Sequence, residues 1–383
     1  MADKPSHDRG GLMEVAGLFF KLGLIAFGGP AAHIAMMEDE VVRRRKWIEE
    51  QHFLDLVGAT NLIPGPNSTE MTMHCGKERA GLAGLIVAGA AFIFPAVVLT
   101  GLLAHLYVTY GQVPQVEPFL YGIKPAVLAI ILSAIYKLGR KALKNAWLGL
   151  LGLAVVLAGL MGLNPVLAIL AAGGIGLLFS GGDLLRKRGF LLALPILFWQ
   201  KAQMAATGIT TAKIFWVFLK VGSVLFGSGY VLVAYLEGEL IARRSWLTEP
   251  ELLDAIAIGQ FTPGPVLSTA TFIGYQLNGI QGAVAATLGI FLPSFLFVYL
   301  LNPLIPKLRS SRLAAAFLDS VNVAAVGIMI AVTIELGRSV LIDWQAWLIA
   351  LIAAGAVLGP RKVSSFWIVL GGAVLGYLAQ TIW

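Results

Sequence analysis

The chain of 383 residues is unusually apolar, because 58% of its residues are hydrophobic and only 13% are charged, against about 45–50% and about 25% in soluble domains. Its mean hydropathy of +0.82 excludes secreted, cytosolic and fibrous proteins and places most of the chain in a lipid bilayer. The net charge of +7 comes from cations in short connectors. Such cations usually report membrane topology and not nucleic-acid binding, and attraction of an anionic solute is the functional alternative.

The start of the chain and its reactive residues exclude several other classes. Residues 1–11 are polar and lack the apolar core of a cleavable signal peptide, so we expect no processing. The single cysteine, Cys75, excludes an intramolecular disulfide and a multi-thiolate metal site. There is no P-loop, and the five histidines lack metal-ligand pairing. The sequence therefore predicts no enzyme, no cofactor and no resident metal.

The chain is an internal duplication. A shift of 199 residues places Lys21-Leu-Gly-Leu-Ile-Ala-Phe-Gly28 on Lys220-Val-Gly-Ser-Val-Leu-Phe-Gly227, and Pro64-Gly65-Pro66 on Pro263-Gly264-Pro265. We therefore predict an all-α polytopic membrane protein built from two homologous halves. The first transporter repeat covers 1–188, the second covers 207–383, and 189–206 is a linker or an extra crossing segment.

Six apolar segments make up each repeat. They lie at 12–37, 52–75, 82–108, 119–137, 146–163 and 165–181 in the first repeat, and at 212–236, 251–276, 282–300, 314–335, 344–358 and 364–380 in the second. The connector after the fourth segment is basic in the first repeat, whereas the connectors after the third and fifth are basic in the second. This inversion predicts halves of opposite orientation, as in many secondary transporters. A duplicated scaffold without transport is the alternative. Thirteen crossings result if every segment spans, and fewer if the first or second segments are re-entrant.

Glycine and proline interrupt the first two segments of each repeat. Phe27-Gly28-Gly29-Pro30 and Phe226-Gly227-Ser228-Gly229 break the first segments, and the two Pro-Gly-Pro sequences break the second. Freed backbone groups are tolerated at membrane depth only inside protein or beside a wet cavity. A helix that begins after Pro-Gly-Pro presents N–H groups that suit an anion. Four breaks in symmetric pairs therefore predict one midplane oxyanion site, with a simple packing kink as the alternative.

Buried charges refine the predicted solute. Lys21 and Lys220 lie about 14 Å inside their helices, and two such cations favour a dianion; pairing with an acid such as Glu14 is the alternative. The predicted substrate-binding residues are Lys21, Gly28, Gly29, Pro30, Asn61, Pro64, Gly65, Pro66, Asn67, Ser68, Thr69, Lys124, Lys220, Gly227, Gln260, Pro263, Gly264, Pro265, Ser268 and Thr269.

Three titratable residues of the first repeat are the predicted proton carriers: Glu70, His33 and His74. Two of them are replaced in the second repeat by residues that do not titrate, because Glu70 corresponds to Thr269 and His33 to Leu232. An ordinary structural role is the alternative for each. The mixed-sign connectors 38–47 and 237–246 are predicted to pair internally as interfacial turns anchored by tryptophan, with gating as the alternative.

These phrases resemble the chromate ion transporter family in its long, two-domain form. The resemblance rests on Phe20-Lys21-Leu-Gly-Leu-Ile-Ala-Phe-Gly-Gly-Pro30, on Asn61-Leu-Ile-Pro-Gly-Pro-Asn-Ser-Thr-Glu70 and on their second-half echoes. The second half departs from the first phrase at Ser228 and Gly229. The resemblance implies that Lys21, the Gly-Gly-Pro and the Pro-Gly-Pro residues form the functional core.

The same resemblance implies a multi-pass chromate exporter of the bacterial inner membrane that confers metal resistance. It implies an antiporter coupled to protons, with sulfate, a similar tetrahedral dianion, as competitor. An anion channel, or a transporter of sulfate or another oxyanion, is the alternative function. A homodimer is a possible oligomeric state. A chromate reductase is disfavoured, because the chain shows no flavin, haem or iron–sulfur signature.

Overall fold

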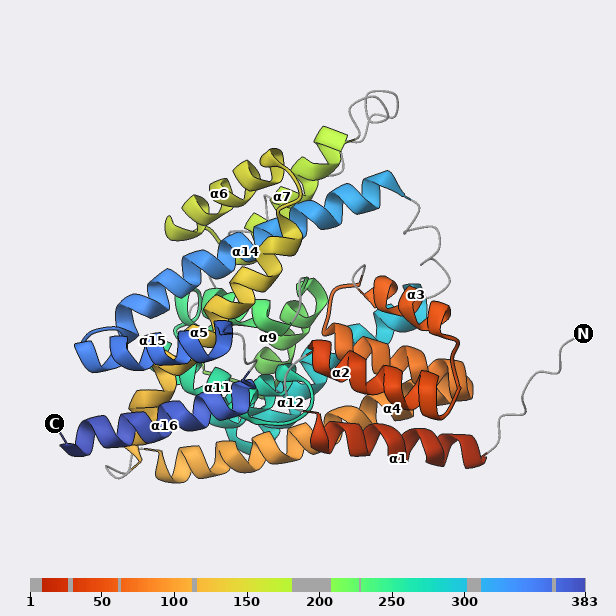
Figure 1. The fold of residues 1–383 in the computed structure, drawn as a ribbon, viewed down its shortest axis with the longest axis horizontal. Helices are drawn as coiled ribbons and strands as arrows, with labels where there is room; N and C mark the ends of the chain where they lie inside the picture. The colour runs from red at the N-terminus through yellow and green to blue at the C-terminus, as the bar shows by residue number, and fades with distance from the viewer. Residues whose placement is uncertain are drawn as a thin grey trace, which may run out of the picture.

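The computed structural model describes residues 9–26, 30–60, 63–111, 116–180, 208–226, 229–301, 311–359 and 363–382. All regular structure in these ranges is helical (Figure 1), which confirms the predicted all-α fold. Five predicted features lie outside the described residues: Gly28, Gly29, Asn61, Gly227 and the segment 189–206.

The helices follow the predicted segments in both repeats. The first repeat contains α1 (Arg9–Ile25), α2 (Pro30–Met37), η1 (Glu38–Arg44), α3 (Glu50–Thr60), α4 (Asn67–Tyr110), α5 (Glu117–Ala142), α6 (Ala146–Leu160) and α7 (Pro165–Ser180). The second contains α9 (Thr211–Val224), η3 (Gly229–Val231), α10 (Leu232–Leu236), η4 (Glu237–Ala242), α11 (Glu249–Phe261), η5 (Val266–Ser268), α12 (Thr269–Leu301), α14 (Arg312–Val340), α15 (Trp344–Leu358) and α16 (Ser365–Ile382). A helix ends and another begins at each of the four predicted breaks.

Both α4 and α12 fold back on themselves at a glycine. Gly81 has φ +63° and Gly279 has φ +55°, a left-handed conformation that glycine adopts without a steric penalty. A Cβ on Gly76 would lie 2.3 Å from the carbonyl oxygen of Gly84, although eight residues span about 12 Å along a straight helix. The part of α4 before Gly81 is therefore a half-helix that returns along the part after it. The half-helix of α12 does the same.

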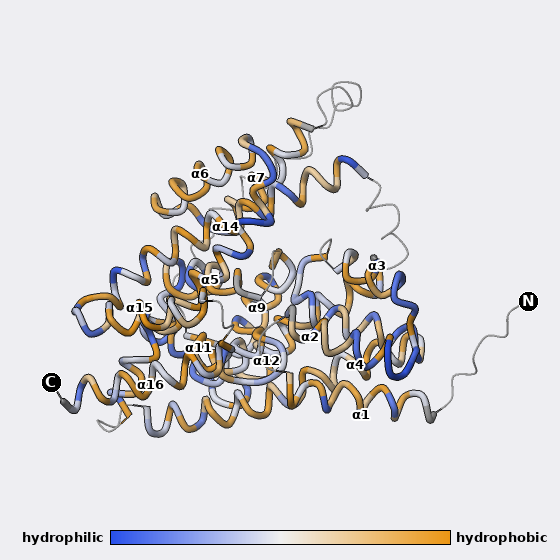
Figure 2. The backbone as a smooth tube through the Cα atoms, viewed as in Figure 1, coloured by the Kyte–Doolittle hydropathy of each residue, from blue (hydrophilic) through white to orange (hydrophobic). Residues whose placement is uncertain are grey.

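Four described helices are long and apolar enough to cross a membrane. They are Asn67–Tyr110, Glu117–Ala142, Val266–Leu300 and Arg312–Val340, and shorter apolar helices cover Ala146–Leu160, Pro165–Phe179, Trp344–Leu358 and Ser365–Thr381. Figure 2 shows hydrophobic residues along these helices and hydrophilic residues gathered at turns and helix ends, notably beside α3 and α4. The total number of crossings stays a prediction.

One long helix of each repeat packs against two helices of the other repeat. Helix α5 of the first repeat packs on α15 and α16 of the second, and the equivalent helix α14 packs on α6 and α7. Small residues permit close approach: a Cβ on Gly122 of α5 would lie 2.1 Å from the carbonyl oxygen of Gly372 in α16. Such reciprocal contacts are those of a two-fold relation. Helices α4 and α12 meet between the repeats, where their half-helices begin.

Candidate functional site

The Pro-Gly-Pro loop of each repeat is hydrogen-bonded to the first break of the other repeat. The Gly264 N–H donates to the carbonyl oxygen of Ala26, just after α1 (3.0 Å), and the Gly65 N–H donates to that of Leu225, just after α9 (2.7 Å). Carbonyl groups at a helix end have no partner within their own helix. The breaks therefore satisfy one another, and the structure brings all four together in two crossed pairs at the interface between the repeats.

Both central glycines of the Pro-Gly-Pro loops adopt backbone angles that other residues avoid. Gly65 has φ +146° and Gly264 has φ +85°. A Cβ on Gly264 would lie 3.0 Å from the Cβ of Ala96. A Cβ on Gly65 would lie 2.2 Å from Oε1 of Glu70 and 2.5 Å from Oγ of Ser294. Glycine at position 65 thus leaves room for two polar side chains, one from each repeat.

Glu70 and Ser294 form a fully buried polar group beside Gly65. Both are 0% exposed, and they lie next to each other. In the part of the chain that the structure describes, neither oxygen of the carboxylate nor the Ser294 hydroxyl makes a hydrogen bond of ordinary geometry. Sequence reasoning found Glu70 but missed Ser294, although this residue directly follows Pro293, the counterpart of Pro95.

Two further buried hydroxyls occupy equivalent positions at the starts of the half-helices. Thr69 and Ser268 are 0% exposed, and neither hydroxyl has a hydrogen-bond partner among the described residues. An unmade buried hydrogen bond costs about 1–3 kcal/mol, so such groups in a native protein require an explanation. Pro66, which precedes the first half-helix, supplies no side-chain cap. Free hydroxyls and helix N–H groups at one place suit a polar, negatively charged ligand.

His33 braces the first break. Its Nε2 lies 2.9 Å from the Ala26 carbonyl oxygen and its Nδ1 lies 3.2 Å from Oγ of Ser68. Because a carbonyl oxygen only accepts, Nε2 carries a hydrogen, and in the neutral ring Nδ1 accepts from the serine hydroxyl. In the second repeat Tyr235 has the corresponding role, since its hydroxyl donates to the Val224 carbonyl oxygen (2.6 Å).

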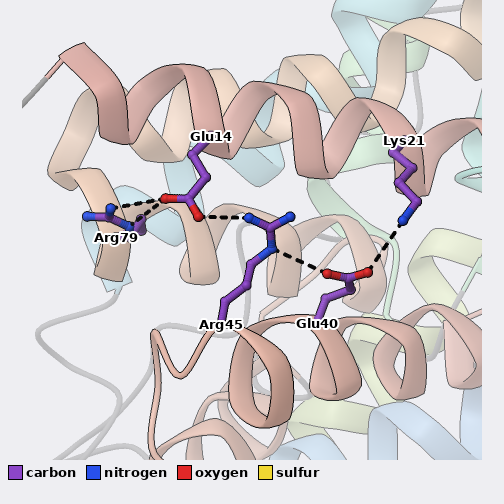
Figure 3. Close-up of polar contacts among 5 residues, drawn as sticks. All are labelled: Glu14, Lys21, Glu40, Arg45 and Arg79. Carbon is purple, nitrogen blue, oxygen red and sulfur yellow. Dashed lines mark hydrogen bonds and ion pairs between the residues drawn. The ribbon is translucent and has the colours of Figure 1, made fainter.

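The lysines predicted to lie deep in the first segments, Lys21 and Lys220, are paired with acids and are 58% and 37% exposed. Lys21 lies 3.5 Å from Oε1 of Glu40, and Lys220 contacts Glu239 at the equivalent place. Figure 3 shows that Glu14, the acid suggested above, instead binds Arg45 (2.7 Å) and Arg79 (3.0 Å). Acid pairing is thus what the structure shows, with a different partner. An anion that contacts either lysine therefore competes with a carboxylate for the ammonium group.

The mixed-sign connectors pair internally, as predicted. Arg43 binds Glu38 (2.9 Å) and Arg44 binds Asp39 (2.8 Å), while the guanidinium of Arg45 lies 5.5 Å from the ring centre of Trp47, within cation–π range. In the second repeat Arg244 lies 5.5 Å from the Trp246 ring centre. These contacts support a folded turn anchored by tryptophan.

Glu239 is the most buried acid of these connectors. Its side chain is 1% exposed and contacts Lys220, Arg243 (3.6 Å) and Arg244. Burial raises the pKa of Glu239, but the hydrogen bonds and charges of Lys220 and Arg244 outweigh burial and hold the pKa below its ordinary value. The carboxylate is therefore ionised, and it neutralises a cluster of cations.

We expect Glu239→Gln to destabilise the protein far more than Glu40→Gln. Removing Glu239 leaves cations without their buried counter-ion, which costs about 3 kcal/mol. Glu40 is less buried, with its side chain 12% exposed, and its partners Lys21, Arg44 and Arg45 are 58%, 64% and 33% exposed, so its pairs contribute about 1 kcal/mol or less. Guanidinium unfolding of both variants in detergent measures the difference. Equal losses for the two variants would contradict this ranking.

The remaining predicted residues separate into two places. Asn67 begins the half-helix of α4, Gln260 lies in the last turn of α11, and the Thr269 hydroxyl donates to the Val266 carbonyl oxygen (2.8 Å). His74 is 1% exposed and follows Glu70 by one turn. Lys124 of α5 lies 3.8 Å from Asp254 of α11. Asp254 precedes the break at the end of α11 by about two turns. The structure therefore places Lys124 in a second polar centre.

Comparisons with known proteins point to one family. The sequence profile of the chromate transporter family matches residues 13–177 and again 212–377, which agrees with two repeats. A chromate transport protein of Cupriavidus metallidurans is 30% identical over 97% of this chain and 94% of its own length. A probable chromate transport protein of Synechococcus elongatus is 30% identical over 91% of this chain and 90% of its own length. A chromate transport protein of Pseudomonas aeruginosa is 31% identical over 84% of this chain and 80% of its own length. No solved structure matches the chain significantly.

Proposed function

Because this chain belongs to the chromate transporter family, which is a family of transporters and not of enzymes, we propose that it moves chromate across a membrane through the crossed breaks. The observation that carries this proposal concerns the hydroxyls of Thr69 and Ser268, which lie at equivalent half-helix starts. Both are fully buried and make no hydrogen bond to any residue that the structure describes. These hydroxyls and the neighbouring backbone N–H groups donate to the oxygens of the dianion.

The positive charge for a dianion comes from the two repeats together. Lys21 and Lys220 lie about one turn before the ends of α1 and α9, so each repeat places one lysine near its first break. In the closed arrangement Glu40 and Glu239 neutralise them. In our proposal the anion competes with these carboxylates for the ammonium groups. The half-helix dipoles contribute a further partial positive charge of about half a unit each.

Transport requires the repeats to move, because the Thr69 and Ser268 hydroxyls of the proposed site are fully buried. In our proposal the repeats lie in opposite orientations, and the crossed hydrogen bonds of Gly65 and Gly264 are broken and remade as the site opens to either side. The reciprocal packing of helices between the repeats supports this, since it makes the two openings equivalent in construction. We place the protein in the bacterial inner membrane as an exporter that confers chromate resistance.

The proton-coupling group in this proposal is Glu70. An ionised carboxylate is costly to bury without partners, and beside a dianion the cost rises, so the charge of Glu70 and the occupancy of the site are linked. His74 lies four residues further on the same half-helix and therefore on the same face, where it can pass a proton to or from Glu70. His33 holds the backbone of the break in place.

Everted membrane vesicles test the function directly. We expect respiring vesicles to accumulate labelled chromate, an uncoupler to abolish accumulation, and sulfate to compete. Glu70→Gln is expected to retain exchange of internal for external chromate and to lose accumulation driven by the proton gradient. Uptake no greater than in vesicles without the protein would overturn the proposal. Uptake that is unchanged by the uncoupler would identify an anion channel. Uptake of sulfate but not chromate would change the substrate.

A further inference from the structure

We propose that Asp254 is a second proton-binding residue of the transport cycle, held between the repeats by Lys124 and Tyr107. This inference rests on the proposed function and extends it. Asp254 belongs to α11 of the second repeat, whereas its partners come from α5 and α4 of the first. The group therefore lies at a contact that must change when the repeats move.

The contacts of Asp254 leave it incompletely satisfied. The residue is 3% exposed. Its Oδ2 accepts a hydrogen bond from the Tyr107 hydroxyl (2.8 Å) and lies 3.8 Å from Nζ of Lys124, beyond ordinary hydrogen-bond distance. Its Oδ1 is buried and has no hydrogen-bond partner among the described residues. A buried carboxylate with one free oxygen and one loosely held cation is a group that can accept a proton.

The surrounding charges are few. Among the described residues, three ionisable groups act on Asp254: Lys124 from α5, Tyr107 from α4 and Glu251 from α11 itself. Glu251 is already engaged, because it caps α11 through Thr248 and accepts a hydrogen bond from Gln276 of α12 (2.9 Å). The Lys124 side chain is 24% exposed, so the group lies at the edge of the described protein interior.

The lysine of this ion pair is not repeated in the other half of the sequence. The counterpart of Asp254 is Asp55, but the counterpart of Lys124 is Asn322. A lysine needed only for the two-fold packing of α5 and α14 would be expected in both places. Glu70 is one-sided in the same way, because its counterpart is Thr269.

Proton-driven export gives the second acid a function. Outward movement of a dianion and inward movement of protons transfer charge in the same direction, so the pH gradient and the membrane potential both drive export, and each further coupled proton adds to this driving force. Glu70 accounts for one proton. Asp254 supplies the second: its carboxylate takes up a proton on one side of the membrane and releases it on the other. Protonation also removes the ionic attraction between Asp254 and Lys124, so it weakens the contact between α11 and α5 while the repeats move.

The test compares Asp254→Asn with Asp55→Asn in everted vesicles. We expect Asp254→Asn to exchange internal for external chromate at a rate within about threefold of the unmodified protein, and to lose at least 10-fold in accumulation driven by a pH gradient. Asp254→Glu should restore accumulation. Asp55→Asn, the matched control in the other repeat, should accumulate chromate normally.

Infrared spectroscopy of the purified protein gives a second readout that needs no chromate. We expect a pH-dependent band of a protonated carboxyl group that is missing in Asp254→Asn and present in Asp55→Asn. Normal accumulation by Asp254→Asn, loss of exchange together with accumulation, or an unchanged infrared titration would each overturn the assignment. Absence of exchange and accumulation in the unmodified protein would instead overturn the proposed function, and the infrared result would still decide whether Asp254 binds a proton.

Discussion

Gly65→Ala is expected to abolish chromate uptake, whereas Gly162→Ala is expected to leave uptake intact. Both glycines have positive φ, +146° and +80°, so both variants carry backbone strain of about 1–2 kcal/mol. The two positions differ in what a Cβ would meet. At Gly65 it would lie 2.2 Å from Oε1 of Glu70 and 2.5 Å from the Ser294 hydroxyl, and at Gly162 nothing lies within 4 Å.

The methyl group therefore acts on the site itself. It must displace a buried carboxylate or separate the Pro-Gly-Pro loop from Leu225, and overpacking of this kind costs about 1–3 kcal/mol. Uptake by vesicles that contain equal amounts of each variant provides the measurement, with unfolding in detergent as the control for stability. If Gly65→Ala transports at the rate of Gly162→Ala, the crossed breaks do not form the site.

Removing the two equivalent hydroxyls is expected to weaken chromate uptake at both positions. A hydrogen bond from a neutral donor to a charged group contributes about 1.5–3 kcal/mol, so Thr69→Val and Ser268→Ala should each raise the chromate concentration for half-maximal uptake by about 10- to 100-fold. Neither hydroxyl has a partner in the described part of the chain, so their removal should leave stability unchanged or slightly raised. The concentration dependence of exchange in vesicles measures the effect.

Ser133→Ala is the matched control for these hydroxyl variants. Ser133 is 1% exposed and its hydroxyl also has no partner among the described residues, but it lies within α5 and not at a half-helix start. We expect this variant to transport as the unmodified protein does. An effect at Ser133 equal to that at Ser268 would mean that buried hydroxyls act on uptake through packing and not as ligands of the anion.

Much of the architecture could be predicted because its signals are local. Runs of about 20 apolar residues predict helices in a bilayer, and glycine and proline predict where those helices stop. The breaks after Ile25, Thr60, Val224 and Phe261 follow from these residue types alone. The repeat was visible because equivalent residues recur at a constant spacing. The connector at 76–81 between the second and third segments was predicted from its polar residues, but the close contact of Gly76 with Gly84 on either side of it was not, since a contact between two helices does not follow from local sequence.

The sequence by itself determined the apolar segments, the duplication, the four breaks and the residue types that favour an anion. The tertiary structure alone decided which groups meet: Gly65 with Leu225, Glu70 with Ser294, and Lys124 with Asp254. It also assigned Glu40, and not Glu14, to Lys21. The physical reason is that helix formation and helix breaking depend on neighbouring residues, whereas these pairs join segments far apart in the chain. Their partners are fixed only when the two repeats pack against each other.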